Sequence, residues 1–343
     1  MTLKQIAEEA GVSISTVSRV LNQKNSHAAT PELQNKIWEI ARRTGYIPST
    51  AARMLRMGGE DKTPLGIIAC LFARDNISIS DNPYFTGIAQ SFEKEALLAN
   101  YSVQCSFTSF DLLNNRMDSV FPKGNVNGVI IIGRHNIETV RLLRKRFRHI
   151  VYAGLMPPAE EKYDSVICNG HQIGYSATKY LIDKHHKRIA YIGDIINEVQ
   201  YQGYCDALLD AGIPYEADLA IPASLSMESG YRGAEQLLTL EPRPTAVFCR
   251  NDYIAIGAMK AIQDAGVKIP KEMSIIGVDD TETSQYSRPR LTSIHTPMEE
   301  LGTIAAKILI DRISKGHTIY MNVSLPFYIV ERDSCAVCKP DEN

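Results

Sequence analysis

The spacing of apolar residues changes near residue 64 of the chain. Before that point apolar side chains recur three or four residues apart, which is the period of a helix that packs along one face. After it, short apolar runs alternate with longer amphipathic segments. This alternation is typical of parallel sheets with helices on both faces. The pattern therefore predicts an all-α N-terminal head followed by an α/β core.

The first 22 residues predict two short helices joined by a tight turn. Thr2 is placed to cap the first helix, which has an apolar face of Ile6, Ala7 and Ala10. Gly11 ends that helix, because glycine adopts a positive φ without steric cost. Ser13 can cap a second helix from Ile14, whose inward side chains are Val17, Val20 and Leu21. Two helices with such a turn make a helix-turn-helix.

The outer face of the second helix carries groups that read DNA bases. Arg19 could bridge guanine O6 and N7, Ser15 could bond to any base, and Ile14 could contact a thymine methyl. The alternative is a helical hairpin whose polar face meets only solvent. We take as DNA-binding candidates the residues Thr2, Ser13, Ile14, Ser15, Thr16, Ser18, Arg19 and Asn22.

A third helix and a short basic segment complete the head. Thr30 precedes Pro31 as a cap precedes a first helical residue, and an apolar period follows at Leu33, Ile37, Ile40 and Ala41. Residues 49–57 can form a helix but are too few to be stable alone in water. We expect them to order only against a partner, and their arginines indicate DNA. The candidates there are Ser49, Ala52, Arg53, Leu55 and Arg56.

The core is predicted to hold two sheets, because its elements are too many for one small sheet. The expected strands are Leu65–Leu71, Val103–Phe107, Gly128–Ile132, Ile150–Ala153, Arg188–Ile192, Ala246–Cys249 and Ser274–Val278. The expected helices include Ile88–Leu98, Glu138–Phe147, Ile173–Lys184, Gly203–Ala211, Tyr231–Leu240 and Ile254–Ala265. Ligands of such folds bind beyond the carboxyl ends of the strands, here in a cleft between the sheets.

Polar and aromatic residues follow several of these strands. Asn82, Tyr84 and Phe85 come after the first strand, while Asn251-Asp252 and Asp279-Asp280 end two later ones. Carboxylates and amides that face an aromatic ring suit a sugar, whose hydroxyls bond to the polar groups while its apolar face stacks on the ring. Alternatively, these residues only form turns and cap helices. Paired acids can also act in catalysis, but no nucleophile, metal set or phosphate loop accompanies them.

Charge and composition indicate in which cellular compartment the protein acts and what kind of partner it binds. Residues 1–56 hold eight Lys and Arg against four acids, a charge of +4, which leaves −6 for the rest of a chain of net charge −2. A basic head on an acidic body is what a DNA-binding module on a separate domain would show. The chain has no apolar leader or long apolar run, and its seven cysteines are scattered, so a cytoplasmic protein without membrane contact is expected. Cys335 and Cys338 are expected to be incidental thiols, and His185-His186 to face solvent.

The chain resembles the lactose-repressor (LacI/GalR) family of bacterial transcription regulators over nearly its whole length. The matching stretches are residues 2–7, 11–13, 16–22, 46–56, 82–85, 251–257, 277–280, 325–326 and 332–334. Each motif is weak alone, and their shared order makes the resemblance specific.

The resemblance implies a homodimer on a palindromic operator, with a periplasmic-binding-protein-like core that binds a small effector between its subdomains. It implies a hinge helix that forms on the operator, with Leu55 wedged into the minor groove. The domains would be a head of residues 1–46, a hinge and linker of 47–63 and a core of 64–338. Within the core, one subdomain would comprise about 64–163 and 293–322, and the other about 164–292 and 323–335.

The chain departs from the family at several positions. Gln200 stands where many sugar-binding members have an arginine, Gly154 where an aspartate often faces the ligand, and His186 replaces a common glycine. The loop of residues 22–30 is also longer than in the lactose repressor. The effector candidates are Asn82, Tyr84, Phe85, Gln200, Asn251 and Asp279.

The sequence thus predicts an effector-controlled repressor of a carbohydrate operon that needs no cofactor or metal. Two other regulator hypotheses stay open, a non-sugar effector and a protein co-effector. A sugar-binding transport receptor without a DNA role would share the core, but the head counts against it. An enzyme is the weakest alternative.

Overall fold

The computed structural model describes residues 3–14, 16–17, 20, 30, 33–34, 36–37, 40, 65–72, 82–106, 126–133, 137–156 and 162–338. The chain divides into two compact units, Met1–Thr63 and Pro64–Asn343. The predicted hinge of residues 47–63 lies outside the described residues, so its boundaries with head and core stay a prediction.

The first unit contains helix α1 (Leu3–Ala10) and helical residues 14, 16–17, 20, 33–34, 36–37 and 40. Its core consists of the predicted inward residues of all three helices, namely Ile6, Ala7, Ala10, Val17, Val20, Ile37 and Ile40. Gly11 has a φ of 74°, as the predicted turn requires. The hydroxyl of Ser13 accepts the N–H of Thr16 at 3.2 Å, and that of Thr30 accepts the N–H of Leu33 at 3.4 Å. Both predicted caps are therefore present.

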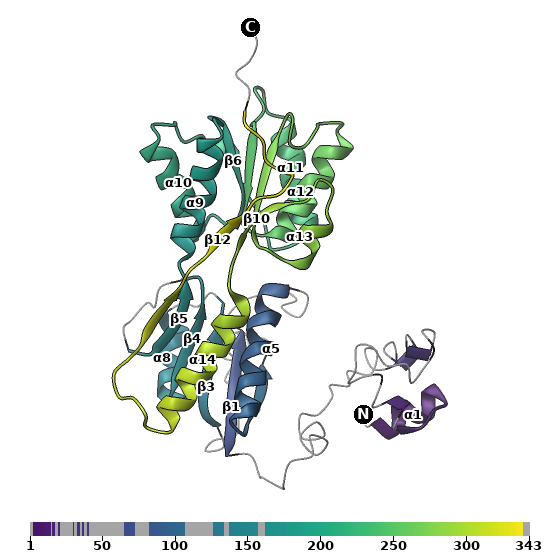
Figure 1. The fold of residues 1–343 in the computed structure, drawn as a ribbon, viewed down its shortest axis with the longest axis vertical. Helices are drawn as coiled ribbons and strands as arrows, with labels where there is room; N and C mark the ends of the chain where they lie inside the picture. Colours follow the sequence, from purple (N-terminus) through teal and green to yellow (C-terminus); the bar gives the residue numbers. More distant parts are fainter. Residues whose placement is uncertain are drawn as a thin grey trace. The chain divides into compact units, whose positions relative to one another are not determined.

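The second unit begins with a parallel sheet of six strands (Figure 1). In spatial order these are β11 (Asn322–Leu325), β5 (Asp164–Cys168), β4 (Ile150–Gly154), β3 (Val126–Ile132), β1 (Gly66–Phe72) and β2 (Tyr101–Ser106). Helices α5 (Pro83–Leu98) and α14 (Met298–Ile313) pack against each other and this sheet. Helix α8 (Ile137–Arg146) packs through Val140 and Leu143 on the opposite face.

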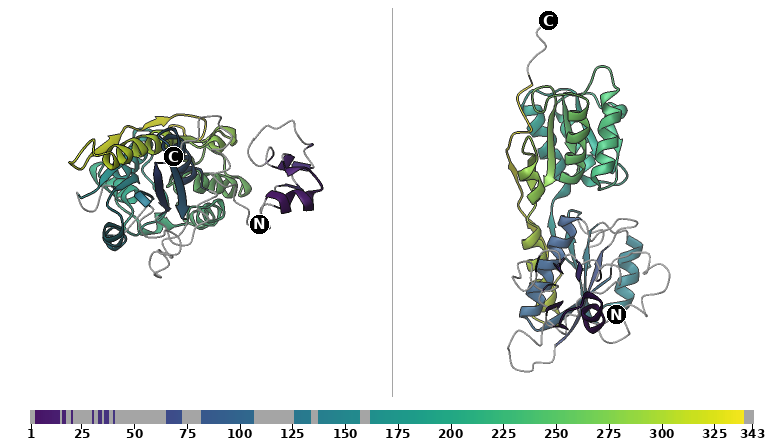
Figure 2. Two further views of the ribbon diagram at one scale, coloured as in Figure 1. Left: turned by 90° about the horizontal axis from the view of Figure 1, so that it is seen from below. Right: turned by 90° about the vertical axis from the view of Figure 1, so that its right-hand side faces the viewer.

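The second sheet also has six strands in the described part of the chain. They are β12 (Tyr328–Val330), β10 (Thr292–His295), β9 (Ser274–Asp279), β8 (Ala246–Cys249), β6 (Ile189–Gly193) and β7 (Ala220–Pro222). Helices α9 (Gly170–Asp183) and α10 (Val199–Asp210) lie on one face, and α11 (Met227–Leu238) and α12 (Asp252–Asp264) on the other (Figures 1 and 2). A 3₁₀ turn (Ala217–Leu219) and the short helix α13 (Glu282–Tyr286) complete this half.

Strand β3 shows why these runs of Val and Ile become buried strands. Val129 and Ile131 point into the cluster beneath α8, while Ile130 and Ile132 point into the cluster on the other face. Successive side chains of a strand alternate between faces, so a strand covered on both sides must be apolar throughout. This is the physical basis of the predicted class, a doubly wound α/β core of two subdomains behind an all-α head, and the structure confirms it.

All seven predicted strands and the six listed helices are present, with ends shifted by a few residues. The prediction missed five strands, β5, β7, β10, β11 and β12, and the helices α13 and α14. The short strand β12 is antiparallel to β10 at the edge of the otherwise parallel second sheet.

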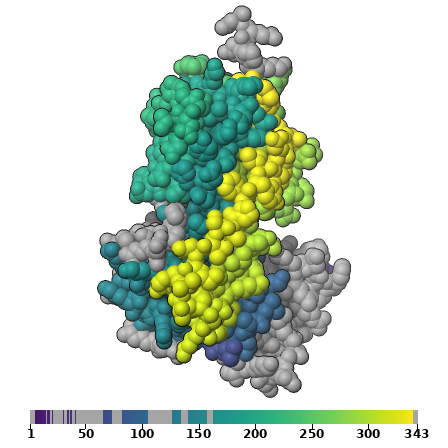
Figure 3. All heavy atoms as spheres, turned by 60° about the vertical axis from the view of Figure 1, so that its left-hand side comes forward, coloured from purple at the N-terminus to yellow at the C-terminus, as the bar shows by residue number. Residues whose placement is uncertain are grey.

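The described chain crosses between the two sheets after β5, after β10 and after β11. The predicted subdomain boundaries, near residues 163, 292 and 322, fall at the starts of β5, β10 and β11. Each of these strands still pairs in the sheet that the chain is about to leave, so the crossing comes after the strand. The C-terminal segment that makes the last crossing is yellow in Figure 3, where it runs along the surface of both halves of this unit. Among the described residues, no helix combines the length and apolar character that a membrane span needs.

Candidate functional site

The described part of the helix-turn-helix exposes two of the predicted DNA contacts. Ile14 has 47% of its surface exposed, which is unusual for a large apolar side chain in a helix that buries Val17 and Val20. Ser13 is exposed at the start of the same helix, and Thr16 is half-buried. The other predicted contacts lie outside the described residues: Thr2, Ser15, Ser18, Arg19, Asn22, Ser49, Ala52, Arg53, Leu55 and Arg56.

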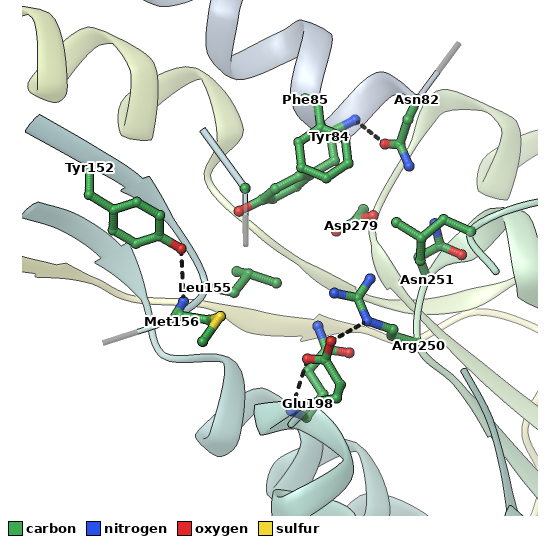
Figure 4. A pocket seen from close by; sticks show the side chains of 13 residues that line it. Asn82, Tyr84, Phe85, Tyr152, Leu155, Met156, Glu198, Arg250, Asn251 and Asp279 are labelled. Carbon is green, nitrogen blue, oxygen red and sulfur yellow. Dashed lines mark hydrogen bonds and ion pairs between the residues drawn. The ribbon is translucent and has the colours of Figure 1, made fainter. Parts of the chain in front are cut away.

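A pocket of about 490 Å³, which includes space open to solvent, lies between the two sheets of the second unit (Figure 4). The centre of a water-sized sphere can reach only about 30 Å³ of this space, so the pocket is narrow. The lining residues are Asn82, Tyr84, Phe85, Gly133, Tyr152, Leu155, Met156, Glu198, Gln200, Leu225, Arg250, Asn251 and Asp279. The structure thus brings all six predicted effector residues into one cavity, which we call the effector pocket.

Two asparagines of the pocket also cap helices. The side-chain oxygen of Asn82 accepts the N–H of Tyr84 at 3.0 Å before α5, and that of Asn251 accepts the N–H of Ile254 at 3.0 Å before α12. Both side chains are only 4% exposed. The helix-capping role that the sequence left open is therefore present. It also leaves the side-chain NH₂ group of both asparagines facing the cavity.

The wall that comes from the first sheet and α5 is mainly aromatic. The rings of Tyr84 and Phe85 are in edge-to-face contact with centroids 5.3 Å apart, and Tyr152 lies beyond them (Figure 4). The hydroxyl of Tyr84 is buried without a hydrogen-bond partner, and this burial raises the pKa of Tyr84 well above its usual range. An unsatisfied buried hydroxyl costs about 1–3 kcal/mol, so a ligand that bonds to it recovers stability.

The opposite wall is polar and comes from the second sheet and α10. Nε of Arg250 donates to the carboxylate of Glu198 at 2.9 Å, and both side chains are nearly buried, at 12% and 3% exposure. Burial acts to lower the pKa of Arg250, but the charge and hydrogen bond of Glu198, together with Tyr191 and Asp279, outweigh it. The pKa of Arg250 is therefore raised, and the guanidinium stays protonated. Beside this ion pair, Gln200 is 1% exposed and its side-chain oxygen has no partner.

Asp279 reaches the same cavity from the end of β9 in a strained backbone conformation. Its backbone φ is 103° and that of Asp280 is 53°, values that residues other than glycine rarely adopt. Burial, and then the neighbouring carboxylate of Asp252, raise the pKa of Asp279 well above its usual range. Such strain needs support from surrounding contacts, and Asp252 provides it.

Asp252 forms two hydrogen bonds with the loop after Asp279 and one with strand β10. Its carboxylate accepts the N–H of Thr281 at 2.7 Å, the hydroxyl of Thr281 at 3.0 Å and the hydroxyl of Ser293 at 2.6 Å. The side chain is completely buried and is not among the pocket-lining residues. Asp252 is therefore an internal brace rather than a ligand contact.

The structure accounts for the departure at Gly154. A Cβ atom on Gly154 would lie 2.2 Å from the hydroxyl oxygen of Tyr152. The Tyr152 ring thus takes the space that an aspartate at position 154 would need, and Tyr152 lines the pocket instead.

The prediction that His186 faces solvent was wrong. Its side chain is 3% exposed, and its ring lies 3.0 Å from the hydroxyls of both Thr245 and Ser274. A positive φ, which favours glycine, falls one residue earlier, on His185 at 67°. His186 joins the end of α9 to the starts of β8 and β9.

Thiols and acids of the described residues form no cluster that could hold a metal ion. The sulfur of Cys335 donates to the carbonyl of Ile275 at 3.0 Å, and burial raises the pKa of Cys335 to about 12. Such a thiol is protonated and unreactive at neutral pH.

Several pocket residues were not predicted, above all Arg250, Glu198 and Tyr152. Arg250 directly precedes Asn251 at the end of a predicted strand, which is a signal that sequence reasoning could have used. Glu198 carried no comparable signal, because its partner is 52 residues away in the sequence.

Comparisons with known proteins identify the family. Residues 2–49 match the model of "Bacterial regulatory proteins, lacI family", and residues 178–335 match "Periplasmic binding protein-like domain". The chain is 32% identical over 320 residues to the HTH-type transcriptional repressor PurR of Mannheimia succiniciproducens, which covers 91% of this chain and 92% of the relative. The chain belongs to the lacI family. It is a DNA-binding transcription regulator and not an enzyme.

Solved structures of transcription regulators share its fold. The transcriptional regulator CelR, in complex with cellobiose, has a TM-score of 0.71 at 24% identity and covers 97% of this chain and 99% of its own. A lacI-family regulator from Enterococcus faecium with bound ribose has a TM-score of 0.68 at 26% identity and covers 80% of this chain and 100% of its own.

Proposed function

We propose that this lacI-family protein represses a carbohydrate-utilisation operon in the cytoplasm and that a sugar-like effector in the effector pocket controls it. The observation that carries the proposal is the set of buried, unpartnered polar atoms beside aromatic rings in one cavity, the Tyr84 hydroxyl and the Gln200 side-chain oxygen. Buried polar groups almost always have partners, so exceptions inside a cavity indicate where a ligand binds.

The two walls of the pocket suit the two kinds of surface on a sugar ring. The apolar face of the ring would stack on Tyr84 and Phe85, and its hydroxyls would bond to Asn251, Gln200 and Asp279. The ribose bound to the 26%-identical regulator from Enterococcus faecium is in line with this class of ligand.

The mechanism we infer is a shift between two arrangements of the core. The pocket is lined from both sheets, so a ligand that bonds to both walls stabilises the arrangement in which they are close. In a homodimer on a palindromic operator, such a change would alter the spacing of the two heads and hence operator affinity. The shift is limited by the difference in ligand affinity between the two arrangements.

A planar heterocycle is the second candidate effector, because the same aromatic wall would stack on it equally well. A ligand screen separates the two classes. Monosaccharides, disaccharides and nucleobases are added singly to the full-length protein, and unfolding temperature is recorded. A ligand at 100 times its Kd stabilises the native state by about 2.7 kcal/mol, so a specific binder raises the unfolding temperature measurably.

The hit is then measured by calorimetry on Asp279→Asn and Tyr84→Phe. We expect each variant to lose at least about tenfold in ligand affinity while operator affinity stays unchanged, because each loses one polar contact in the pocket. Asp183→Asn, an exposed acid paired with Lys179, is the control and should bind as wild type. Unchanged affinity in both pocket variants, or a screen in which only nucleobases bind, would overturn the sugar proposal.

A further inference from the structure

The charged groups that line the effector pocket neutralise one another. Arg250 supplies one positive charge, and Glu198 supplies a negative charge 2.9 Å from it. Asp279 is the remaining ionisable acid of the wall, and burial favours its uncharged form. The lining therefore carries a net charge of zero, or of −1 if Asp279 ionises.

The helix N-termini at the pocket are capped by their own side chains. Helices α5, α10 and α12 all begin there, and a helix N-terminus by itself attracts anions. The carboxylate of Glu198 caps α10 by accepting the N–H of Gln200 at 3.3 Å, while the neutral Asn82 and Asn251 cap α5 and α12. One terminus thus already has a carboxylate, and at the other two an asparagine oxygen takes one of the N–H groups that an anion would need.

The residue at position 200 leaves the pocket with one cation fewer than the family resemblance leads one to expect. Gln200 stands where the resemblance leads one to expect an arginine on α10, and its buried amide is neutral. The arginine of this pocket comes instead from the residue after β8, and Glu198 on α10 holds it. An anionic ligand would therefore meet a guanidinium that is already paired and two carboxyl groups close by.

We propose that the effector pocket selects an uncharged polyhydroxy ligand over phosphorylated and acidic sugars, and that Glu198 sets this selectivity by neutralising Arg250. The inference rests on the proposed function and names the ligand class within it. Burying a charge without a partner costs several kcal/mol, so a phosphate or carboxylate on the ligand has no compensation in this cavity.

Matched ligand sets test the inference in the full-length protein. For each neutral sugar that binds, calorimetry compares the free sugar with its phosphate ester and its uronic acid. We expect wild type to bind the neutral member at least about tenfold more tightly than either anion. Glu198→Gln keeps an oxygen for the α10 cap but removes the charge, and should raise affinity for the phosphate ester at least about tenfold relative to the neutral sugar.

The control variant is Glu228→Gln, whose side chain is 73% exposed at the start of α11 and pairs with Arg232. It should keep the wild-type preference. A wild type that prefers the phosphate ester, or a folded Glu198→Gln with an unchanged preference, overturns the inference while sugar binding itself stands. If Glu198→Gln does not fold, the wild-type preference alone decides. A wild type that binds no sugar of any charge contradicts the proposed function instead.

Discussion

Asp252 shows how a residue outside the pocket controls its geometry. Its carboxyl group is hydrogen-bonded to Thr281 and Ser293, and it lies against Gly277, where a Cβ atom would be 2.4 Å from its oxygen. The brace joins α12 to the loop that follows Asp279 and to β10. The strained φ of Asp279 is therefore maintained by contacts on the side of the loop away from the ligand.

The first prediction at the scale of residues concerns how the stability of the protein depends on pH. Burial raises the pKa of Asp252 to about 7 from an ordinary value of 3.8, against the opposing effect of hydrogen bonds from Ser293 and Thr281. Between about pH 4 and pH 7 the folded protein holds a proton here that the unfolded chain has lost. The free energy of unfolding should therefore fall as pH rises through this window, by up to about 1.4 kcal/mol per pH unit from this group.

Urea unfolding at pH 5 and pH 7, followed by circular dichroism, measures this dependence. Asp252→Asn cannot ionise, so its stability should fall less between the two pH values than that of wild type, although its absolute stability is lower because an acceptor is lost. Asp183→Asn, exposed on α9, should keep the wild-type pH dependence. The same pH dependence in Asp252→Asn and wild type would contradict a proton on Asp252.

Single site residues were predictable where a polar side chain follows the end of a predicted strand. Asn251 and Asp279 were found in this way, because Asp279 directly follows an apolar run and Asn251 follows one after the single residue Arg250. The Arg250–Glu198 pair was not, because it depends on α10 and β8 meeting in space. His186 was misjudged for the same reason, since the groups that bury it come from two other strands.

At the scale of elements, close helix pairs support both halves of the core. A Cβ atom on Gly203 of α10 would lie 2.0 Å from the carbonyl oxygen of His171, and one on Gly257 of α12 would lie 1.9 Å from that of Met227. In the first subdomain, Gly302 of α14 meets α5 in the same way, with 2.2 Å to the carbonyl oxygen of Ile88. The pairs α9–α10, α11–α12 and α5–α14 thus approach backbone to backbone. Their first turns, in α5, α10 and α12, border the pocket.

Gly302→Ala is expected to destabilise the core by about 1–3 kcal/mol, because α5 and α14 must separate to admit the methyl group. Gly87→Ala, in the same helix pair, is the matched control. Its Cβ atom would be 3.5 Å from Cβ of Met298, an ordinary contact, and alanine is the better helix former by roughly 0.5–1 kcal/mol. The urea midpoint should fall in the first variant and stay or rise in the second. Equal midpoints would mean that α14 can move without cost.

Strands with continuous apolar runs were predictable, and short strands with polar residues or at a sheet edge were not. Strands β3 and β9 contain the apolar runs 129–132 and 275–278, so the sequence alone indicates them. Strands β7 and β12 have three residues each, and their pairing depends on the neighbouring strand rather than on their own residues. Helix α14 is a different case, since the helical spacing of Leu301, Ala305 and Leu309 is visible in the sequence and would have predicted it.

At the scale of the whole molecule, the sequence predicted a head and a core of different construction. The chain divides after Thr63, close to the end of the predicted linker. The change from helical spacing to alternating runs is visible there because each unit must bury its own apolar residues. The effector pocket lies in the second unit and the predicted helix-turn-helix in the first, so control of operator binding by the effector requires both units. Residues 47–63, the predicted hinge and linker, connect the head to the core.

The last prediction concerns Leu55, which lies outside the described residues. Residues 49–57 are fewer than the roughly 12–15 that a helix needs to be stable alone in water, so we expect this segment to gain its order from a partner. If it docks on the operator, Arg53 and Arg56 lie near phosphates and Leu55 wedges into the minor groove, as the family resemblance implies. Leu55→Ser should then lose operator bending and much of the specific affinity, while salt-dependent binding to random DNA persists.

A gel-shift bending assay on the operator and a titration on random DNA separate these two effects. Leu209→Ser is the control, since Leu209 is a leucine of α10 with 75% of its surface exposed and should affect neither DNA measurement. Effector affinity should be unchanged in both variants, because Leu55 belongs to the first unit and Leu209 is not among the described residues that line the pocket. If Leu55→Ser keeps full bending and full discrimination against random DNA, the segment is a passive linker, and the effector must act on the operator through the heads by another route.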